Sequence, residues 1–342
     1  MSNIEWTTNE FVLQLHITDK CLNNCRHCYL DSKNKRSMSK DQVLGIIEQF
    51  RRLLDQYEDV SEGKCDGILQ VTGGDPLLEL DLLHFILDEC NRYKIKVAIL
   101  GNPDFLTAPI LHDLIGRNLR SYQISVDGTR SVHDQFRGKE GSFDNSLNAL
   151  SLLRENDAKS FVMFNLHKEN MSEIIEVYDE VSQAGAAYFV FARVVSIGEA
   201  KKNNLDVDIS PNEYRELLKN IEKHAEESGG AKLVYKCPLW TLYKHETGEL
   251  QNQEEVIFGG CGAGINTLSI DVNGDVMPCR RVQDVVGNVF EGDIADMFFG
   301  EKLDKYRFPE HAGDCGDCEL FNCCRGCKAL GNTDPQCWKN KS

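Results

Sequence analysis

The chain has 342 residues, with 54 acidic against 38 basic side chains, a net charge of −16 and a hydrophobic fraction of 41%. This length can bury the core of one large domain and of a smaller second one. The acidic balance argues against a nucleic-acid partner, and the lack of an apolar run of about eighteen residues argues against a membrane-spanning helix or a membrane partner.

The N-terminus carries no basic segment followed by an apolar one, so we expect no signal peptide and a cytoplasmic location. The chain holds 14 cysteines. Because cytosolic thiols stay reduced, this density indicates metal binding rather than disulfides. Three cysteines lie within residues 21–28 and eight lie beyond residue 260, which places the expected metal sites toward the two ends of the chain.

The first strand is expected over residues 11–17, and a cysteine-rich loop, Cys21-Leu-Asn-Asn-Cys25-Arg-His-Cys28, follows it. Its three thiolates can hold three irons of a four-iron cluster, and no fourth cysteine lies near enough in sequence to complete the set. The remaining iron would be open to a small molecule. A structural zinc site is the alternative, although structural zinc takes four protein ligands.

This Cys-x3-Cys-x2-Cys loop resembles the signature of the radical S-adenosylmethionine (SAM) superfamily. The resemblance implies that Cys21, Cys25 and Cys28 hold a [4Fe-4S] cluster whose open iron binds SAM. SAM would then be cleaved to a 5′-deoxyadenosyl radical that abstracts hydrogen from a substrate. His27 stands where the family usually has an aromatic residue, and Tyr29, directly after the third cysteine, is a candidate cofactor contact.

Strand-like runs alternate with amphipathic helical stretches as far as about residue 230, the pattern of βα units around a parallel sheet. The six strands are expected at residues 11–17, 67–72, 96–101, 121–126, 160–166 and 188–193. The first helix is expected to start at the capping box Ser39 to Gln42, and the others near residues 80–93, 108–117, 143–155, 171–184 and 211–227. Six units suit a partial (β/α)6 barrel of TIM type, whose site lies at the carboxyl ends of the strands.

The second and third strands end in motifs suited to a ligand. Gly73-Gly74-Asp75-Pro76 follows the second strand, where glycines let the backbone approach a ligand and expose its amides. This motif resembles the Gly-Gly-Glu-Pro of radical SAM enzymes, which binds the amino group of SAM, although Asp75 is one methylene shorter than Glu. Asn102, after the third strand, matches part of the family's Thr-Asn-Gly.

The fourth strand ends in Ser125-Val-Asp127, and an Arg137-Gly pair follows nine residues after that strand's Gly128. Ser125 and Asp127 alternate onto one side of the strand. The segment resembles a block found in radical SAM enzymes that carry extra clusters. By this resemblance, Ser125 contacts SAM, Asp127 belongs to the same site, and Arg137 pairs with the carboxylate of SAM, which guanidinium geometry suits. His133 is expected to stabilise local structure.

The last two expected strands end near Asn170 and at Arg193, which are candidates to line the SAM or substrate pocket. The βα rhythm stops at residues 228–230. We therefore expect a barrel over residues 1–230 and a cysteine-rich unit over residues 231–342. In that unit, alternating apolar residues around Asn273-Gly274 predict a β-hairpin that brings Cys261 and Cys279 together.

The later cysteines resemble the SPASM extension of radical SAM enzymes, a small domain with two auxiliary [4Fe-4S] clusters. The resemblance implies one cluster on Cys261, Cys279 and Cys327, with Cys237 or an open iron in the fourth place. The second cluster would take the other four cysteines of the motif, which are Cys315, Cys318, Cys324 and Cys337.

Two neighbouring cysteines compete for one place in the second cluster. Cys324 keeps the expected spacing from Cys318, whereas Cys323 would keep the expected spacing to Cys327, and we assign Cys324. Zinc is the alternative to iron and sulfide at these positions, because Cys-x2-Cys pairs alone also suit zinc. Cys65 and Cys90 lie in apolar runs, which predicts buried thiols without metal.

Radical SAM enzymes with this extension mostly modify peptides. The resemblance therefore implies a maturase of ribosomally made peptides (RiPP maturase) that forms a crosslink or a thioether or inverts a stereocentre. One alternative is radical chemistry on a tetrapyrrole or another small cofactor precursor, whose acidic groups Arg280 and Arg281 could bind. The other is an iron–sulfur electron carrier or scaffold without radical chemistry.

The implied partners are a peptide substrate, with or without a separate recognition protein, and a reductant such as flavodoxin or ferredoxin. Only ten residues precede the first strand, so we expect no N-terminal peptide-recognition domain. Relatives that mature sulfatases have a base aspartate where this chain has Arg280, which disfavours formylglycine formation. The sequence assigns no acid, base or radical-quenching residue.

Overall fold

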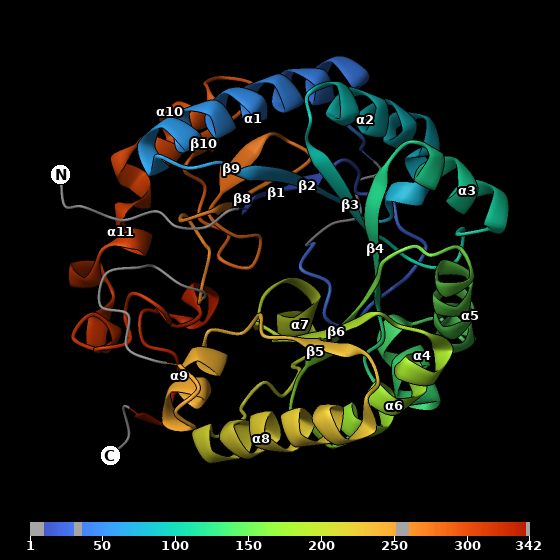
Figure 1. Ribbon diagram of the computed structural model, residues 1–342, viewed down its shortest axis with the longest axis vertical. Helices are drawn as coiled ribbons and strands as arrows, with labels where there is room; N and C mark the ends of the chain where they lie inside the picture. The colour runs from blue at the N-terminus through green and yellow to red at the C-terminus, as the bar shows by residue number, and fades with distance from the viewer. Residues whose placement is uncertain (1–9, 31–35, 251–259, 340–342) are drawn as a thin grey trace.

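The computed structural model describes residues 10–30, 36–250 and 260–339. The expectation that the N-terminus carries no signal peptide concerns residues outside these ranges. A ten-stranded sheet in the order β10-β9-β8-β1-β2-β3-β4-β5-β6-β7 runs through the molecule. Figure 1 shows the long helices as an outer ring around the strands. In the described ranges, every helix is too short or too polar to span a bilayer.

The strands are β1 (Glu10–His16), β2 (Asp66–Thr72), β3 (Lys96–Leu100), β4 (Leu119–Ser125), β5 (Ser160–Leu166), β6 (Tyr188–Arg193), β7 (Lys232–Val234), β8 (Thr267–Ile270), β9 (Asp275–Met277) and β10 (Gly287–Asn288). The helices are α1 (Lys40–Ser61), α2 (Leu80–Arg92), α3 (Ala108–Gly116), α4 (Arg130–Arg137), α5 (Ser142–Glu155), α6 (Ile174–Ala184), α7 (Gly198–Lys202), α8 (Pro211–Ser228), α9 (Leu239–Glu246), α10 (Ile294–Phe299) and α11 (Asp304–Arg307).

The six expected strands form, and each pairs in parallel with the next, from β1 to β6. Helix α1 begins at the expected capping box, in which the Ser39 hydroxyl accepts the amide of Gln42 at 3.2 Å and the Gln42 side chain accepts the amide of Ser39 at 2.9 Å. The partial barrel that the alternating pattern predicts is therefore confirmed, and its first and last parallel strands are not hydrogen-bonded to each other.

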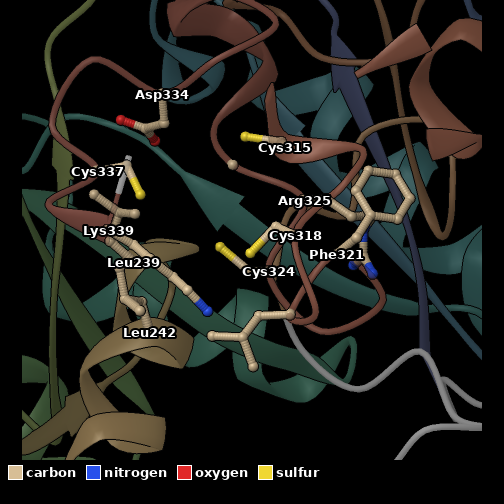
Figure 2. Close-up of a pocket in the computed structure, with 12 residues that line it drawn as sticks. Leu239, Leu242, Cys315, Cys318, Phe321, Cys324, Arg325, Asp334, Cys337 and Lys339 are labelled. Atoms are coloured by element: carbon tan, nitrogen blue, oxygen red, sulfur yellow. The ribbon is translucent and has the colours of Figure 1, made fainter. Parts of the chain in front are cut away.

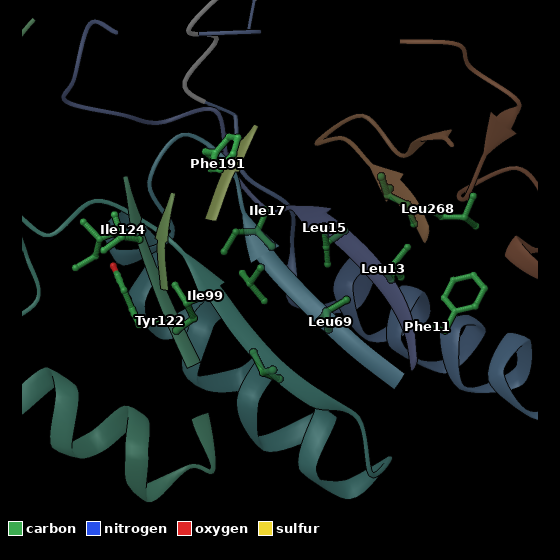
Figure 3. Packing of buried hydrophobic residues seen from close by; sticks show 14 of the residues in the cluster. Phe11, Leu13, Leu15, Ile17, Leu69, Ile99, Tyr122, Ile124, Phe191 and Leu268 are labelled. Atoms are coloured by element: carbon green, nitrogen blue, oxygen red, sulfur yellow. The ribbon is translucent and has the colours of Figure 1, made fainter. Parts of the chain in front are cut away.

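Alternation along β1 separates the core from the interior of the barrel. Phe11, Leu13 and Leu15 are fully buried, and Figure 3 shows them on the face of β1 that packs against the helices. Burial of such a side chain contributes about 1.5–3 kcal/mol. Gln14 points the other way and lines a cavity inside the barrel. The same period-two alternation places polar residues of several strands around that cavity.

The segment after residue 260 joins the sheet instead of forming a separate layer. Strand β8 pairs in parallel with β1, and β9 pairs antiparallel with β8 through the expected turn at Asn273-Gly274. The hairpin is thus confirmed, but its attachment to β1 is not evident from the sequence. Strand β7 continues the sheet beyond residue 230, so the boundary expected there stays a prediction.

Candidate active site

A cavity of about 310 Å³ lies at the carboxyl ends of the strands. Its lining includes Cys21, Cys25 and Cys28 of the cysteine-rich loop after β1, and Cys279 and Arg280 after the β8–β9 hairpin. The two cysteine-rich regions, more than 230 residues apart in sequence, therefore face one chamber. This is the edge of the sheet at which parallel α/β folds place their ligands.

Helix α4 holds the cysteine loop in place. The amide of Asn24 donates to the Arg137 carbonyl at 3.1 Å, and the amide of Arg26 donates to the Phe136 carbonyl at 2.9 Å. The ring of His27 stacks on Phe136 with 4.6 Å between centroids. Burial, helped by Arg137, lowers the pKa of His27 to about 3, so this imidazole is neutral and serves as the flat apolar residue that the family usually has before the third cysteine.

Arg137 reaches the cysteine loop and is held by Asp127. One guanidinium nitrogen lies 3.6 Å from the Cys25 sulfur, and another forms a buried ion pair with Asp127. Burial would raise the pKa of Asp127, but Arg137 and the neighbouring histidines outweigh it and the net pKa is lowered. The other Asp127 oxygen accepts the amide and side-chain amide of Asn165, both at 2.8 Å. Arg137 lines the cavity with Ser125, whereas Asp127 lies behind it.

The Gly73-Gly74 turn fits tightly under the cysteine loop. A Cβ at Gly74 would overlap the carbonyl of Lys20, and Gly73 has a φ of +156°. Two amides of this turn bind the loop: Gly74 donates to the Thr18 carbonyl at 2.6 Å, and Asp75 donates to the Lys20 carbonyl at 2.7 Å. Both glycines line the cavity. The sequence therefore needs glycine here for close backbone contact as well as for ligand access.

Asp75 and Asn102 occupy neighbouring positions with different exposure to the cavity. Asn102 lines it and directs its side-chain amide at the Cys21 sulfur at 3.5 Å. The Asp75 carboxylate is 1% exposed, is absent from the cavity wall, and accepts the amides of Leu77 at 3.2 Å and Asn102 at 3.4 Å. Its position makes it a cap for the turn that carries Asn102.

The buried carboxylate of Asp75 gives a pH-dependent prediction. Burial raises the pKa of Asp75 to about 6 from its ordinary value of 3.8, so its ionisation destabilises the folded state as pH rises through this range. We expect Asp75→Asn to stabilise the protein relative to wild type, with the advantage growing by roughly 1–1.5 kcal/mol from about pH 5 to about pH 8. Urea unfolding at several pH values measures this, and an advantage independent of pH would contradict it.

Tyr29 lies near cysteines of both regions that line the cavity, Cys28 and Cys279. Its hydroxyl lies 3.0 Å from Nε2 of His16, and the Arg280 guanidinium covers its ring at 5.3 Å. Burial raises the pKa of Tyr29 to about 12, Arg280 lowers it, and the thiols of Cys28 and Cys279 both raise it. The sequence did not indicate His16 as a partner of Tyr29. Its place at the end of β1, where site residues are expected, was the one sign that could have suggested it.

Three of the expected auxiliary ligands gather around one arginine. Arg281 donates to the Cys327 sulfur at 3.9 Å and also interacts with the thiols of Cys279 and Cys261. A guanidinium is a suitable counter-charge for a group of thiolates. Cys237 does not share this place: its sulfur accepts from Arg193 at 3.4 Å and lies near Tyr214. Among the described residues, the Cys237 thiol contacts Arg193 and Tyr214 rather than the three thiols, which favours an open fourth place.

The other four expected ligands line one small cavity in the C-terminal segment. Figure 2 shows Cys315, Cys318, Cys324 and Cys337 around it, with Leu239 of α9 nearby. Cys323 does not line this cavity. The Cys324 thiol is deeply placed, and burial raises its pKa. In this geometry Cys324 is the better placed of the two neighbours, in agreement with the spacing argument.

The two neighbouring cysteines can be separated by mutation. We expect Cys324→Ser to lose the iron of one cluster, about four irons per chain, because it removes one of four thiolate ligands. Cys323→Ser is the matched control and should keep the wild-type iron content. Iron and acid-labile sulfide after anaerobic reconstitution measure both, and the reverse pattern would assign the ligand to Cys323.

The donor sets fit iron–sulfur clusters better than single ions. Within residues 10–30, 36–250 and 260–339, no three Cys, His, Asp or Glu side chains converge closely enough to hold one metal ion. A cubane cluster instead needs three or four thiols spread around a space, which both C-terminal groups and the loop after β1 provide. Cys65 and Cys90 are buried at 6% and 0% exposure in the core, away from these groups.

Comparisons with known proteins agree with this architecture. The family model of the radical SAM superfamily matches residues 15–181, and that of SPASM, an iron–sulfur cluster-binding domain, matches residues 261–328. The chain is 25% identical over 345 residues to the AdoMet-dependent heme synthase of Methanosarcina barkeri, covering 95% of this chain and 93% of that protein.

Two further similarities are to a bacteriocin biosynthesis protein and to a protein crystallised with a precursor peptide. The chain is 27% identical over 348 residues to the antilisterial bacteriocin subtilosin biosynthesis protein AlbA of Bacillus subtilis, covering 92% of this chain and 69% of that one. Its fold is similar to the crystal structure of Streptococcus suis SuiB bound to precursor peptide SuiA, with a TM-score of 0.72, 19% identity, and coverage of 96% and 76% of the two chains.

Proposed function

Because the chain belongs to the radical SAM superfamily and carries a C-terminal SPASM domain, we propose that it is an enzyme that modifies a residue of a peptide substrate. The proposed products are a crosslink, a thioether or an inverted stereocentre. The observation that carries the proposal is that one cavity is lined both by the loop with Cys21, Cys25 and Cys28 and by Cys279. A peptide side chain entering it would meet both.

The radical SAM domain binds a [4Fe-4S] cluster and SAM, and the SPASM domain binds iron–sulfur clusters. When bound, these groups supply a 5′-deoxyadenosyl radical and a route for electrons. We propose that Cys21, Cys25 and Cys28 hold the first cluster and that the C-terminal cysteines hold two auxiliary ones. The ligands proposed for these two are the sets Cys261, Cys279 and Cys327, and Cys315, Cys318, Cys324 and Cys337.

The surrounding residues position the reactants. Gly73, Gly74, Ser125 and Asn102 line the side of the cavity next to the cysteine loop, where SAM would lie. Arg137 is available there for an anionic group, since one of its nitrogens faces the Cys25 sulfur while Asp127 fixes its orientation. Met163, Val194 and Ile197 give the cavity an apolar side that excludes water from a radical.

A second candidate function is radical chemistry on a tetrapyrrole. It is favoured by the similarity to the heme synthase and by the arginines and lysine on the cavity wall. The peptide proposal rests instead on the similarity to the subtilosin biosynthesis protein, and this similarity extends over 69% of that protein's length. Both candidates need SAM cleavage, so they differ only in the substrate.

The test uses the anaerobically reconstituted enzyme with SAM and a reductant. We expect 5′-deoxyadenosine to form, and a short peptide encoded next to the gene to lose hydrogen or change configuration, as read by mass spectrometry and chiral analysis of its residues. If 5′-deoxyadenosine forms and a carboxylated porphyrin is the molecule that is modified, the second candidate is established instead. No 5′-deoxyadenosine in any mixture would contradict both.

A further inference from the structure

The charges that face the active-site cavity are all of one sign. Its wall contains Arg137, Arg193, Lys236, Arg280 and Arg281, and among the described residues it contains no Asp or Glu. The whole chain, in contrast, has 54 acidic and 38 basic residues. A concave site that is cationic within an acidic protein selects anionic ligands, because its walls focus the local potential.

Three of the five cations already have partners. Arg137 pairs with Asp127. Arg193 forms two hydrogen bonds of 2.6 Å with the carboxylate of Asp334. Arg281 donates to the Arg193 carbonyl at 3.0 Å and faces the thiols around Cys327. Arg193 and Arg281 therefore hold the protein and its thiols, and Arg137 is the cation proposed above for the SAM side of the cavity, so these three leave little charge for the substrate itself.

Arg280 and Lys236 are the two cations that remain. Arg280 is 7% exposed, and its Nε has no hydrogen-bond partner. Its Nη1 makes only long contacts, with the Met277 sulfur at 3.7 Å and with the Asp271 carboxylate at 3.9 Å. No ion pair or side-chain hydrogen bond of Lys236 occurs within the described ranges, and Lys236 lies near Arg281 and Cys279. A buried guanidinium with an unsatisfied nitrogen and only a long ion pair is costly, since its desolvation is only partly offset.

Building on the proposed function, we propose that Arg280 and Lys236 form a subsite for a carboxylate of the substrate. The guanidinium of Arg280 offers the planar pair of donors that a carboxylate accepts. Lys236 adds a second charge in the same cavity, near Cys279, the residue before Arg280. Arg280 also covers the ring of Tyr29. A carboxylate bound here would therefore hold the substrate beside that ring, near Cys28 and Cys279. The substrate carbon that reacts is therefore close to an acidic group.

The carboxylate can come from an acidic residue of a peptide or from a side chain of a tetrapyrrole, and binding experiments distinguish them. The first arm selects peptides from a randomised library on the reconstituted enzyme with SAM and counts Asp and Glu in the bound fraction. The second arm compares coproporphyrin III with its tetramethyl ester by fluorescence titration. We expect one acid-bearing ligand to bind at least about tenfold better than its neutral counterpart, as the loss of a buried charge pair implies.

The variants Arg280→Gln, Lys236→Gln and their double combination should lose this preference. Lys219→Gln, on the exposed side of α8, is the matched control and should keep it. Arg280→Lys should keep part of the preference, which makes the proposal testable even if the glutamine variants fold poorly. SAM affinity and iron content should stay at wild-type levels in all variants.

Each outcome bears on the proposal. Acid preference in the library that the double variant loses supports a peptide carboxylate, and acid preference only in the porphyrin pair supports the subsite while removing the peptide function. The subsite is overturned if the double variant keeps the wild-type preference for acid-bearing ligands, or if neither arm shows such a preference for the wild type. So does a loss of SAM binding or iron in the double variant, since the two cations would then serve the cofactors. Wild-type 5′-deoxyadenosine formation tests the proposed function independently.

Discussion

The triple variant Cys21→Ala/Cys25→Ala/Cys28→Ala should lose SAM cleavage completely and keep about two thirds of the iron. The three thiols line the active-site cavity, which Cys279 of one C-terminal group also lines, whereas the group of Cys315, Cys318, Cys324 and Cys337 lines a separate cavity. At about four irons per cluster, the iron content should fall from about twelve to about eight per chain. Iron, acid-labile sulfide and 5′-deoxyadenosine, measured after anaerobic reconstitution, give the result.

The matched control for this prediction is Cys65→Ala/Cys90→Ala. Both thiols are buried in the hydrophobic core, and the charged groups that affect them are Asp, Glu and Arg rather than cysteines, so their loss should leave the iron content and SAM cleavage unchanged. The reading of the C-terminal cysteines would be wrong if the wild type held about four irons or fewer together with zinc. A triple variant that still cleaves SAM would overturn the assignment of the first cluster.

The variant Asp334→Ala should destabilise the reconstituted protein by about 3–5 kcal/mol, because it leaves the buried guanidinium of Arg193 without its partner. Asp334 accepts two bonds of 2.6 Å from Arg193, and its oxygens also accept the amides of Cys327 and Gln336, both at 3.1 Å. It therefore connects the end of β6 to the loop that carries the auxiliary ligands. Denaturant unfolding measures the loss.

Two further variants test whether the loss of stability comes from the unpaired buried charge. Glu319→Ala removes an exposed, solvent-screened ion pair with Lys339 in the same segment and should destabilise the protein far less than Asp334→Ala. The double variant Arg193→Met/Asp334→Leu removes both charges and should recover part of the stability, since no buried charge is left unpaired. If Asp334→Ala costs no more than Glu319→Ala, the buried pair does not hold the two parts together.

The barrel strands were predictable because each is a short apolar run with its own boundary signals. Strands β5 and β6 occupy the expected residues, and the expected first helix begins at the Ser39 capping box. These features depend on neighbours in sequence, which a local pattern contains. The cysteine loop was equally visible, since its three ligands lie within eight residues.

Features that depend on distant neighbours were not predictable in this way. The sequence offered Cys237 as a fourth cluster ligand, but the fold places its thiol against Arg193 and Tyr214. Lys236 drew no attention because an isolated lysine is ordinary, and only the cavity around it shows that its charge has no counterpart. Contacts of this kind arise from packing between segments and leave no spacing in the sequence.

The pairing of β8 with β1 has a consequence for the order in which the enzyme is built. Strand β1 leaves the ribosome first, yet the partner for its second edge begins only at Thr267. Contacts so far apart in sequence form late, because a long loop must close first. Until then, β1 exposes an unpaired edge of the kind that other chains can join. The loop after β1 is thus fully supported only in the finished polypeptide, and insertion of its cluster should follow synthesis rather than accompany it.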